Sequence, residues 1–271
     1  MSAQADKARS FLDLHVPRKP LLMPNAWDAG SAKLLASLGF EALATTSSGH
    51  AATLGRLDGS VTRDEALAHA AFIVAAVDVP VSADLENCFA DDPEGVAETI
   101  RGARRAGLAG CSIEDFTGDA DDPIYPLELA AERVKAAAAS AHEGDVQLVL
   151  TARSENYLHG RPDIEDTVAR LQAFQDAGAD VLYAPGIKDP DELRRITGAL
   201  ERPVNALGLN GAPTVSELAS LGVARVSVGG AFAFAALGAL VEAAEELRDH
   251  GTYGYLERAA TGGRAARRAF S

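Results

Sequence analysis

The 271-residue sequence predicts a (β/α)8 (TIM) barrel, because short apolar or β-branched runs alternate regularly with longer stretches of helical periodicity. Eight such runs occur, and eight parallel strands joined by helices close a barrel. Since α/β barrels of roughly 250 residues commonly form one domain, we expect one domain over residues 1–271, with a helical tail from about residue 231. An open doubly wound sheet is the alternative, but its glycine-rich first turn is missing from Met23–Asp28.

The predicted strands are runs of apolar and β-branched residues bounded by Gly, Pro or Asp, which is the pattern of buried parallel strands. In chain order they are Leu21–Asn25, Ala42–Ser47, Val81–Glu86, Gly110–Glu114, Gln147–Arg153, Val181–Pro185, Val204–Leu207 and Arg225–Val228. Active sites of such barrels lie at the carboxyl ends of the strands, so the last residues of each run are candidate site residues.

The predicted helices follow the strands and carry recognisable start and stop signals. They include Asp28–Leu38, Arg63–Val77, Pro93–Ala106, Ile164–Ala177 and Phe232–Arg248. Asp92 and Asp189 each precede a proline, which places a capping carboxylate before a residue favoured in the first helical turn. Gly39 and Gly178 stand just before the next apolar run, as left-handed helix caps do.

The charge and cysteine content argue against several classes of protein. With 25 Lys and Arg against 39 Asp and Glu, the formal net charge is −14, which disfavours a nucleic-acid surface of clustered cations. Cys88 and Cys111 are too few for a disulfide framework, so we expect a reducing, cytoplasmic location. Residues 231–241 form the longest apolar stretch, shorter than the roughly 18 residues of a membrane span, and residues 1–20 lack a signal-peptide pattern. We therefore expect neither nucleic-acid nor membrane partners.

Carboxylates end two neighbouring predicted strands. Alternation places Asp84 and Glu86 on one face of their strand, and Glu114 with Ser112 on one face of the next. Such carboxylates repel one another unless a cation or hydrogen-bond donors compensate. Hard oxygen ligands with few imidazoles nearby favour Mg²⁺ or Mn²⁺ over Zn²⁺. The alternative is that these acids only cap the helices that follow.

Two further strand ends could bind an anion. Arg153, at the end of the fifth strand, could hold a carboxylate or phosphoryl group with two parallel hydrogen bonds, or form an internal ion pair with Glu155 or Glu114. Residues 45–50, Thr-Thr-Ser-Ser-Gly-His, are expected to form a loop of small hydroxyl residues whose backbone amides could bind an anionic oxygen, although such runs are commonly turns.

Several short motifs occur in a specific order over about residues 10–240. They are Pro24–Asp28, Thr45–Gly49, Leu54-Gly55, Asp58-Gly59, Pro80–Glu86, Ile113–Asp115 and Thr151–Arg153. Their joint spacing resembles that of the isocitrate lyase/phosphoenolpyruvate mutase superfamily. The resemblance implies a (β/α)8 barrel that binds Mg²⁺ and a small 2-oxo or 2-hydroxy carboxylate. It also implies a homodimer or homotetramer whose subunits exchange the last helix.

The same resemblance assigns roles to individual residues. It implies that the metal and its waters are held by Asp84, Glu86 and Glu114, with Asp58 close to the reacting centre. It implies that the substrate contacts Thr46, Ser47, Ser48, Gly49, Arg153 and Asn205. The chemistry it implies is stabilisation of an enolate by the metal while the bond to the adjacent carbon or phosphorus breaks.

The region after the fourth strand departs from the superfamily pattern. Isocitrate and methylisocitrate lyases carry a Cys there as general acid, and mutases carry a Lys-rich segment with an Asn, whereas residues 116–126 contain no Cys, Lys or His. His50 and Tyr125 are the groups near the predicted mouth that could replace this acid, or they are an exposed loop histidine and a packed tyrosine.

Three functions are consistent with these observations. The first is a Mg²⁺-dependent lyase that cleaves a C–C bond of a small 2-oxo or 2-hydroxy acid through an enolate, decarboxylation included. The second is an enzyme that breaks or moves a P–C bond, like phosphoenolpyruvate mutase or phosphonopyruvate hydrolase. The third is a non-catalytic protein that binds 2-oxoacids.

Overall fold

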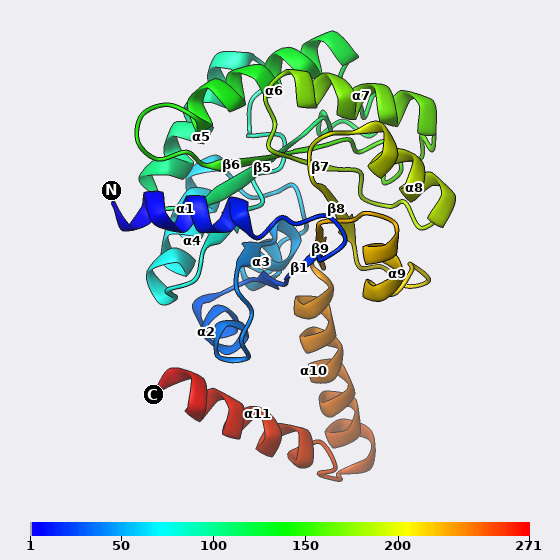
Figure 1. Ribbon diagram of the computed structural model, residues 1–271. Helices are drawn as coiled ribbons and strands as arrows, with labels where there is room; N and C mark the ends of the chain where they lie inside the picture. The colour runs from blue at the N-terminus through cyan, green and yellow to red at the C-terminus, as the bar shows by residue number, and fades with distance from the viewer. Residues whose placement is uncertain (1) are drawn as a thin grey trace.

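The computed structural model describes residues 2–271 and contains a closed barrel of parallel strands surrounded by helices (Figure 1). The strands are β1 (Leu21–Met23), β2 (Asn25–Ala26), β3 (Leu43–Thr45), β4 (Val81–Ala83), β5 (Gly110–Glu114), β6 (Val149–Arg153), β7 (Val181–Tyr183), β8 (Val204–Leu207) and β9 (Arg225–Ser227). Their order is β1-β9-β8-β7-β6-β5-β4-β3-β2, and β1 continues directly into β2, so the sheet closes on itself. The predicted (β/α)8 barrel is confirmed.

The predicted first strand is divided in two at Pro24. Leu21–Met23 pairs with β9, whereas Asn25 and Ala26 pair with β3 on the other side. Proline has no backbone N–H, so it cannot donate to the ladder at the point where the chain changes partners. Its carbonyl still accepts a hydrogen bond from Ala44 at 3.0 Å.

The helices surround the strands and begin and end close to the predicted positions. They are α1 (Ala3–Asp13), α2 (Ala29–Ser37), α3 (Ser47–Thr53), α4 (Arg63–Ala76), α5 (Pro93–Arg105), α6 (Leu127–Ala141), α7 (Ile164–Asp176), α8 (Pro190–Ala199), α9 (Val215–Ser220), α10 (Ala231–His250) and α11 (Leu256–Phe270). Asp92 and Asp189 accept hydrogen bonds from backbone amides of α5 and α8, as their capping role requires. Gly39 and Gly178 adopt left-handed φ values of 91° and 106° after α2 and α7.

The prediction that residues 45–50 form a loop is wrong, because Thr45 ends β3 and Ser47 begins α3. Thr46 is the N-cap of α3, and its hydroxyl accepts a hydrogen bond from the amide of Gly49. Small residues with hydroxyl groups are favoured at helix N-caps as well as in turns, so the run of Ser and Thr did not separate the two structures.

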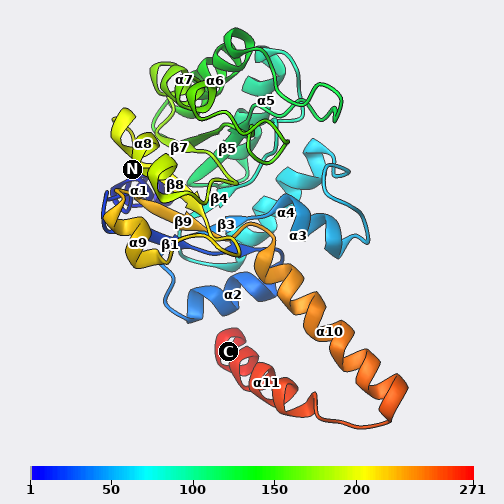
Figure 2. The ribbon, with the colours of Figure 1, turned by 90° about the vertical axis from the view of Figure 1, so that its right-hand side faces the viewer.

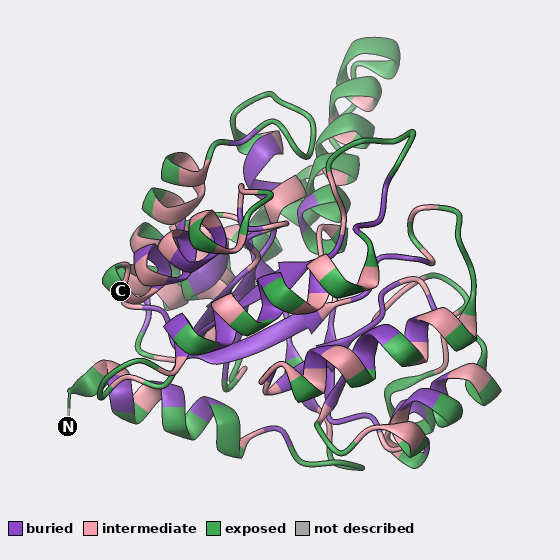
Figure 3. Cartoon of the chain, turned by 90° about the horizontal axis from the view of Figure 1, so that it is seen from above, coloured by how far each residue is buried: buried purple, intermediate pink, exposed green. Residues whose placement is uncertain are grey.

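Helix α1 covers the amino ends of the strands. Ala8 and Phe11 are buried there against Leu21, Val149 and Val181, each at or near the start of its strand. This end of the barrel is therefore filled, and the carboxyl ends remain for a binding site. Seen from above, most strand residues are buried and the helices packed on the barrel alternate buried and exposed residues, whereas α10 and α11 are mostly exposed (Figure 3).

Helices α10 and α11 form an arm that extends from the barrel (Figures 1 and 2). Helix α11 returns toward α2, where Phe270 lies against Gly30. Large apolar side chains exposed on α10 are Phe232, Phe234, Leu237, Leu240, Val241 and Leu247. Within residues 2–271, no helix combines the length and apolar character needed to cross a membrane.

Candidate active site

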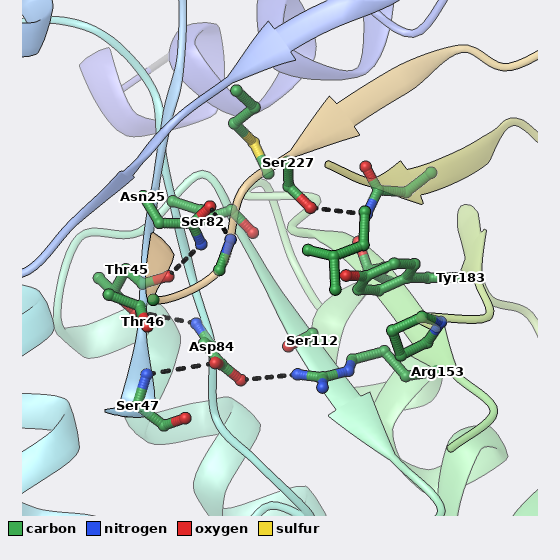
Figure 4. A pocket seen from close by; sticks show the side chains of 18 of the residues that line it. Asn25, Thr45, Thr46, Ser47, Ser82, Asp84, Ser112, Arg153, Tyr183 and Ser227 are labelled. Carbon is green, nitrogen blue, oxygen red and sulfur yellow. Dashed lines mark hydrogen bonds and ion pairs between the residues drawn. The ribbon is translucent and has the colours of Figure 1, made fainter. Parts of the chain in front are cut away.

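A cavity of about 200 Å³ opens at the carboxyl ends of the strands (Figure 4). The predicted site residues that line it are Thr46, Ser47, Ser48, Asp58, Asp84, Arg153 and Asn205. The polar residues that line it without having been assigned a role from the sequence are Asn25, Thr45, Ser82, Ser112, Thr151, Tyr183, Arg225 and Ser227. Polar side chains from most strands of the barrel thus face one small space.

Arg153 forms ion pairs with three carboxylates at one wall of the cavity. Its Nη1 lies 2.9 Å from Asp84 Oδ1, its Nη2 lies 3.1 Å from Glu114 Oε2, and its Nε lies 2.8 Å from Glu155 Oε1. Of the two roles considered for Arg153, the structure shows the internal ion pair. Burial lowers the pKa of Arg153, but Glu114, Glu155 and Asp84 raise it well above its usual value, so the guanidinium stays charged.

This surface, formed by Arg153 and the carboxylates of Asp58, Asp84, Glu86, Glu114 and Glu155, is called the acidic wall below. Its carboxylates outnumber its one cation. Burial raises the pKa of Glu114 against the opposing effect of Arg153, and partial burial together with Asp84 raises the pKa of Asp58. Burial, Asp84 and Asp58 raise the pKa of Glu86 to about 7. The wall therefore carries an unbalanced negative charge that a further cation would neutralise.

Glu86 has an unusual backbone conformation. Its φ of 50° lies in the left-handed region, which costs energy for a residue other than glycine. Its side chain lines a small cavity that adjoins the main one, together with Asp84 and Ser47. The fold therefore holds a carboxylate beside Asp84 at an energetic cost.

These residues fit a hydrated Mg²⁺ better than a fully protein-bound metal. Among residues 2–271, no three His, Cys, Asp or Glu side chains converge as a ready-made ligand cage. Mg²⁺ commonly keeps several waters and binds proteins through one or two carboxylates. Asp84, which lies in the main cavity, would supply a direct ligand. Glu86, which lines the adjoining cavity with Asp84, and Glu114, which shares Arg153 with Asp84, would hold its waters.

Residues 47–49 form the first turn of α3 beside Asp84. The amide of Ser47 donates to Asp84 Oδ2 at 3.2 Å, and the hydroxyls of Ser48 and Thr46 are 3.2 Å apart. A side chain at Gly49 would collide with Thr46 and Trp27, so glycine is required for this approach. Hydroxyl and amide donors thus lie next to the acidic wall, where a substrate carboxylate could bind.

His50 does not have the environment of a proton donor. It is buried on α3, and its ring stacks on that of His69 with centroids 3.8 Å apart. Burial and His69 lower the pKa of His50 to about 4, so it is neutral near pH 7. His50 is therefore not the exposed loop histidine of the second alternative, although it does line the small cavity that also contains Asp84 and Glu86.

Tyr125 also lies away from the cavity. It is buried, its hydroxyl donates to Asp91, and the guanidinium of Arg133 lies 4.0 Å from its ring centre. Burial and Asp91 raise its pKa to about 12. Of the two alternatives for Tyr125, the structure shows the packed tyrosine, and Tyr125 is not among the residues that line the main cavity.

Residues 116–126, where the resemblance implies an acid-bearing loop, are held by hydrogen bonds within the loop and to Asp115 at its start. The amide of Thr117 donates to the carbonyl of Pro123, and that of Tyr125 donates to Asp115. Phe116 stacks on His159 with ring centroids 3.8 Å apart. None of the residues that line the main cavity comes from this loop.

Several lining residues escaped the sequence analysis although strand alternation marks them. Thr151 lies two residues before Arg153, and Arg225 lies two residues before Ser227, so each pair shares one face of its strand. The sequence analysis considered chiefly the last polar residue of each strand. The preceding inward position would have revealed Thr151 and Arg225.

Comparisons with known proteins agree with this architecture. The family model described as phosphoenolpyruvate phosphomutase matches residues 11–248. A crystal structure of a candidate lyase/mutase from Burkholderia cenocepacia J2315 has a TM-score of 0.95 and 53% sequence identity, and the match covers 99% of this chain and 98% of that one.

Two curated relatives match over most of their lengths. An uncharacterized protein of Mycobacterium tuberculosis is 36% identical over 242 residues, which are 89% of each chain. An oxaloacetate decarboxylase of Chromohalobacter salexigens is 30% identical over 269 residues, covering 91% of this chain and 87% of that one.

Proposed function

The chain belongs to the isocitrate lyase/phosphoenolpyruvate mutase superfamily, and from this membership we propose that it is a Mg²⁺-dependent carbon–carbon lyase of small 2-oxo or 2-hydroxy dicarboxylates. Members of this superfamily are C–C lyases and mutases, so the chain is an enzyme of that superfamily. The observation that carries the proposal is the acidic wall around Asp84, which faces a small polar cavity and lacks sufficient positive charge. Oxaloacetate decarboxylation is the reaction we favour.

The residues of the cavity would bind and orient the substrate. Ser47 and Ser48 offer donors for a carboxylate beside Asp84, with Asp58 close by. Mg²⁺ bound at this wall would supply the positive charge that stabilises an enolate as it forms. Burial raises the pKa of Tyr183 to about 12, so its hydroxyl remains protonated and can donate to an oxygen of the substrate.

The two thiols cannot replace the missing acid of the loop. Cys88 and Cys111 are fully buried free cysteines, as expected for the cytoplasmic location that we propose. Burial raises the pKa of Cys111 to about 12 and holds that of Cys88 well above its usual value, so both stay protonated and inaccessible. A reaction that needs only a stabilised enolate therefore fits this site better than one that needs a positioned thiol acid.

Cleavage of a P–C bond is the second candidate, because the matching family model is that of phosphoenolpyruvate phosphomutase. The same acidic wall and metal would serve that chemistry. It is less favoured because all three nitrogens of Arg153, the cation nearest the wall, are already paired with carboxylates. A phosphonate would have to compete with those carboxylates for its donors.

Turnover with a panel of substrates separates the candidates. The purified protein with Mg²⁺ is supplied with oxaloacetate, methylisocitrate, 2,3-dimethylmalate or phosphonopyruvate, and the products are followed by NMR. We expect turnover of a C–C substrate, with oxaloacetate the fastest. Turnover of phosphonopyruvate alone would support the second candidate. Binding of these acids without turnover would indicate the non-catalytic binding protein.

We also propose that the arm of α10 and α11 packs against a second copy of the chain. Phe234 and Leu240 on α10 are 51% and 64% exposed, and apolar surface of this kind is typical of subunit interfaces. A homodimer or homotetramer would cover it. Light scattering on the full chain tests this, and a monomer at micromolar concentration would contradict it.

A further inference from the structure

Arg225 is a buried cation that lines the cavity away from the acidic wall. It is the first residue of β9, is 3% exposed, and donates to Asn205 Oδ1 at 3.0 Å and to Thr151 Oγ1 at 3.1 Å. Its third contact is His15 Nε2, 3.2 Å from Nη1. The other ring nitrogen of His15 lies 2.8 Å from the carbonyl of Phe11, to which it must donate, so Nε2 is an acceptor and the ring is neutral.

All three partners of Arg225 are therefore uncharged. Burial lowers the pKa of Arg225 to about 10, which leaves it protonated near pH 7. Arg153, the other arginine that lines the cavity, is neutralised by three carboxylates, whereas no carboxylate among residues 2–271 pairs with Arg225. A buried charge without a counter-ion is costly unless an ion of opposite charge comes close.

A chain of hydrogen bonds connects this charge to the cavity. Because Arg225 Nε donates to Asn205 Oδ1, the amide of Asn205 must turn its Nδ2 the other way, and Nδ2 donates to Ser227 Oγ at 2.9 Å. The hydroxyl hydrogen of Ser227 is then available for Tyr183 or for a ligand. Each bond points its donor from Arg225 toward the cavity, so the arginine polarises the whole chain.

The two ends of the cavity thus differ in charge. In Figure 4, Asp84 and Ser47 lie at one end and Ser227 lies toward the other, with Tyr183 between Ser227 and Arg153. A ligand with one anionic group at the acidic wall and its metal would place a second anionic group near Ser227 and Arg225.

We propose that Arg225, acting through Asn205 and Ser227, forms an anion subsite that binds the second carboxylate of the substrate and so selects dicarboxylates over monocarboxylates. This inference rests on the proposed function, since the first carboxylate is taken to bind beside Asp84. Arg225 is a positioning residue in this account, and Ser227 is the group that contacts the carboxylate.

Calorimetric binding of two unreactive acids tests the subsite. Malate and lactate share the 2-hydroxy carboxylate, and malate has the second carboxylate. In the presence of Mg²⁺, we expect wild-type protein to bind malate at least about tenfold more tightly than lactate, which corresponds to one charge-assisted hydrogen bond.

Substitutions then locate the preference. Asn205→Asp has the same size but places a negative charge against Arg225, and Ser227→Ala removes the terminal hydroxyl. Each should weaken malate binding about tenfold or more and change lactate binding much less. Arg225→Gln should abolish the preference and Arg225→Lys should restore part of it. Ser216→Ala, on the exposed surface of α9, is the matched control and should retain the preference.

The outcomes separate this inference from the function on which it rests. If lactate and malate bind wild-type protein equally, or if Ser227→Ala and Asn205→Asp weaken both acids to the same extent, the subsite is refuted and the proposed function is unaffected. If neither malate, lactate nor oxalate binds in the presence of Mg²⁺, the proposed function is overturned and the subsite with it. The two small substitutions keep the test decisive even if the variants of buried Arg225 do not fold.

Discussion

Replacing Arg153 by Lys should destabilise the protein and weaken its binding of anionic ligands. The guanidinium contacts Asp84, Glu114 and Glu155 from three different nitrogens, and its side chain is 14% exposed. A lysine keeps the charge but presents one compact ammonium group, which cannot occupy three such positions. Loss of two hydrogen bonds to charged groups, at about 1.5–3 kcal/mol each, predicts a decrease of about 3–6 kcal/mol in the free energy of unfolding.

Urea unfolding followed by circular dichroism measures this decrease, first in excess EDTA and then with MgCl₂. The matched control is Arg161→Lys, which alters an ion pair with Asp122 whose side chains are 48% and 80% exposed. That change should cost less than about 1 kcal/mol. Oxalate binding, measured by calorimetry with Mg²⁺, should weaken in the Arg153 variant only. An Arg153→Lys protein as stable as the control variant, with unchanged oxalate affinity, would refute the reasoning.

Three other predictions concern acid stability, the core and the missing acid. Burial and Arg225 lower the pKa of His15 from 6.5 to about 3. Below pH 6.5 this histidine is therefore protonated in the unfolded chain but stays neutral in the folded protein, so the free energy of unfolding decreases as the pH falls. Between about pH 7 and pH 5, His15→Gln should therefore lose about 2 kcal/mol less than wild type in urea unfolding, and equal losses would contradict the assignment. Phe11→Ala empties a fully buried position under the barrel and should cost about 3–5 kcal/mol in the same assay, and a loss below about 1 kcal/mol would show that α1 does not close this end. Isocitrate cleavage should lie about 10²–10⁴-fold below a typical turnover of roughly 10 s⁻¹, because no loop acid is available. Rapid isocitrate cleavage that disappears in Cys88→Ser or Cys111→Ser would show that a thiol acid has been relocated.

The sequence predicts the barrel because several independent local patterns agree on the positions of the strands and helices. Apolar runs of strand length, glycine caps such as Gly39 and Asp-Pro starts such as Asp92-Pro93 all favour the same alternation of strands and helices. The prediction that Asp84 and Glu114 approach one another follows from the same logic, since the carboxyl ends of adjacent parallel strands meet. Their common ion-pair partner, Arg153, shows that they do.

The errors arise where local chemistry allows two structures or where tertiary contacts decide. Hydroxyl residues near Thr46 are equally compatible with a turn and a helix start. His50 and Tyr125 were chosen for their titratable groups, but only the fold determines that one stacks on His69 and the other turns away toward Asp91. Strand alternation marks Arg225 as an inward-facing residue, but only the fold shows that its hydrogen-bond partners are uncharged.

Oxaloacetate decarboxylation tests the central claim most directly. The rate is measured by loss of oxaloacetate absorbance, with excess EDTA or with MgCl₂, for wild type, Asp84→Asn and the exposed control Asp78→Asn. Rates without protein are subtracted, because Mg²⁺ alone promotes the reaction. We predict turnover by wild type and the control only with MgCl₂, and a loss of about 100-fold or more in Asp84→Asn with an unchanged circular dichroism spectrum. Full activity of the wild-type protein in excess EDTA, or of Asp84→Asn with MgCl₂, would contradict the account.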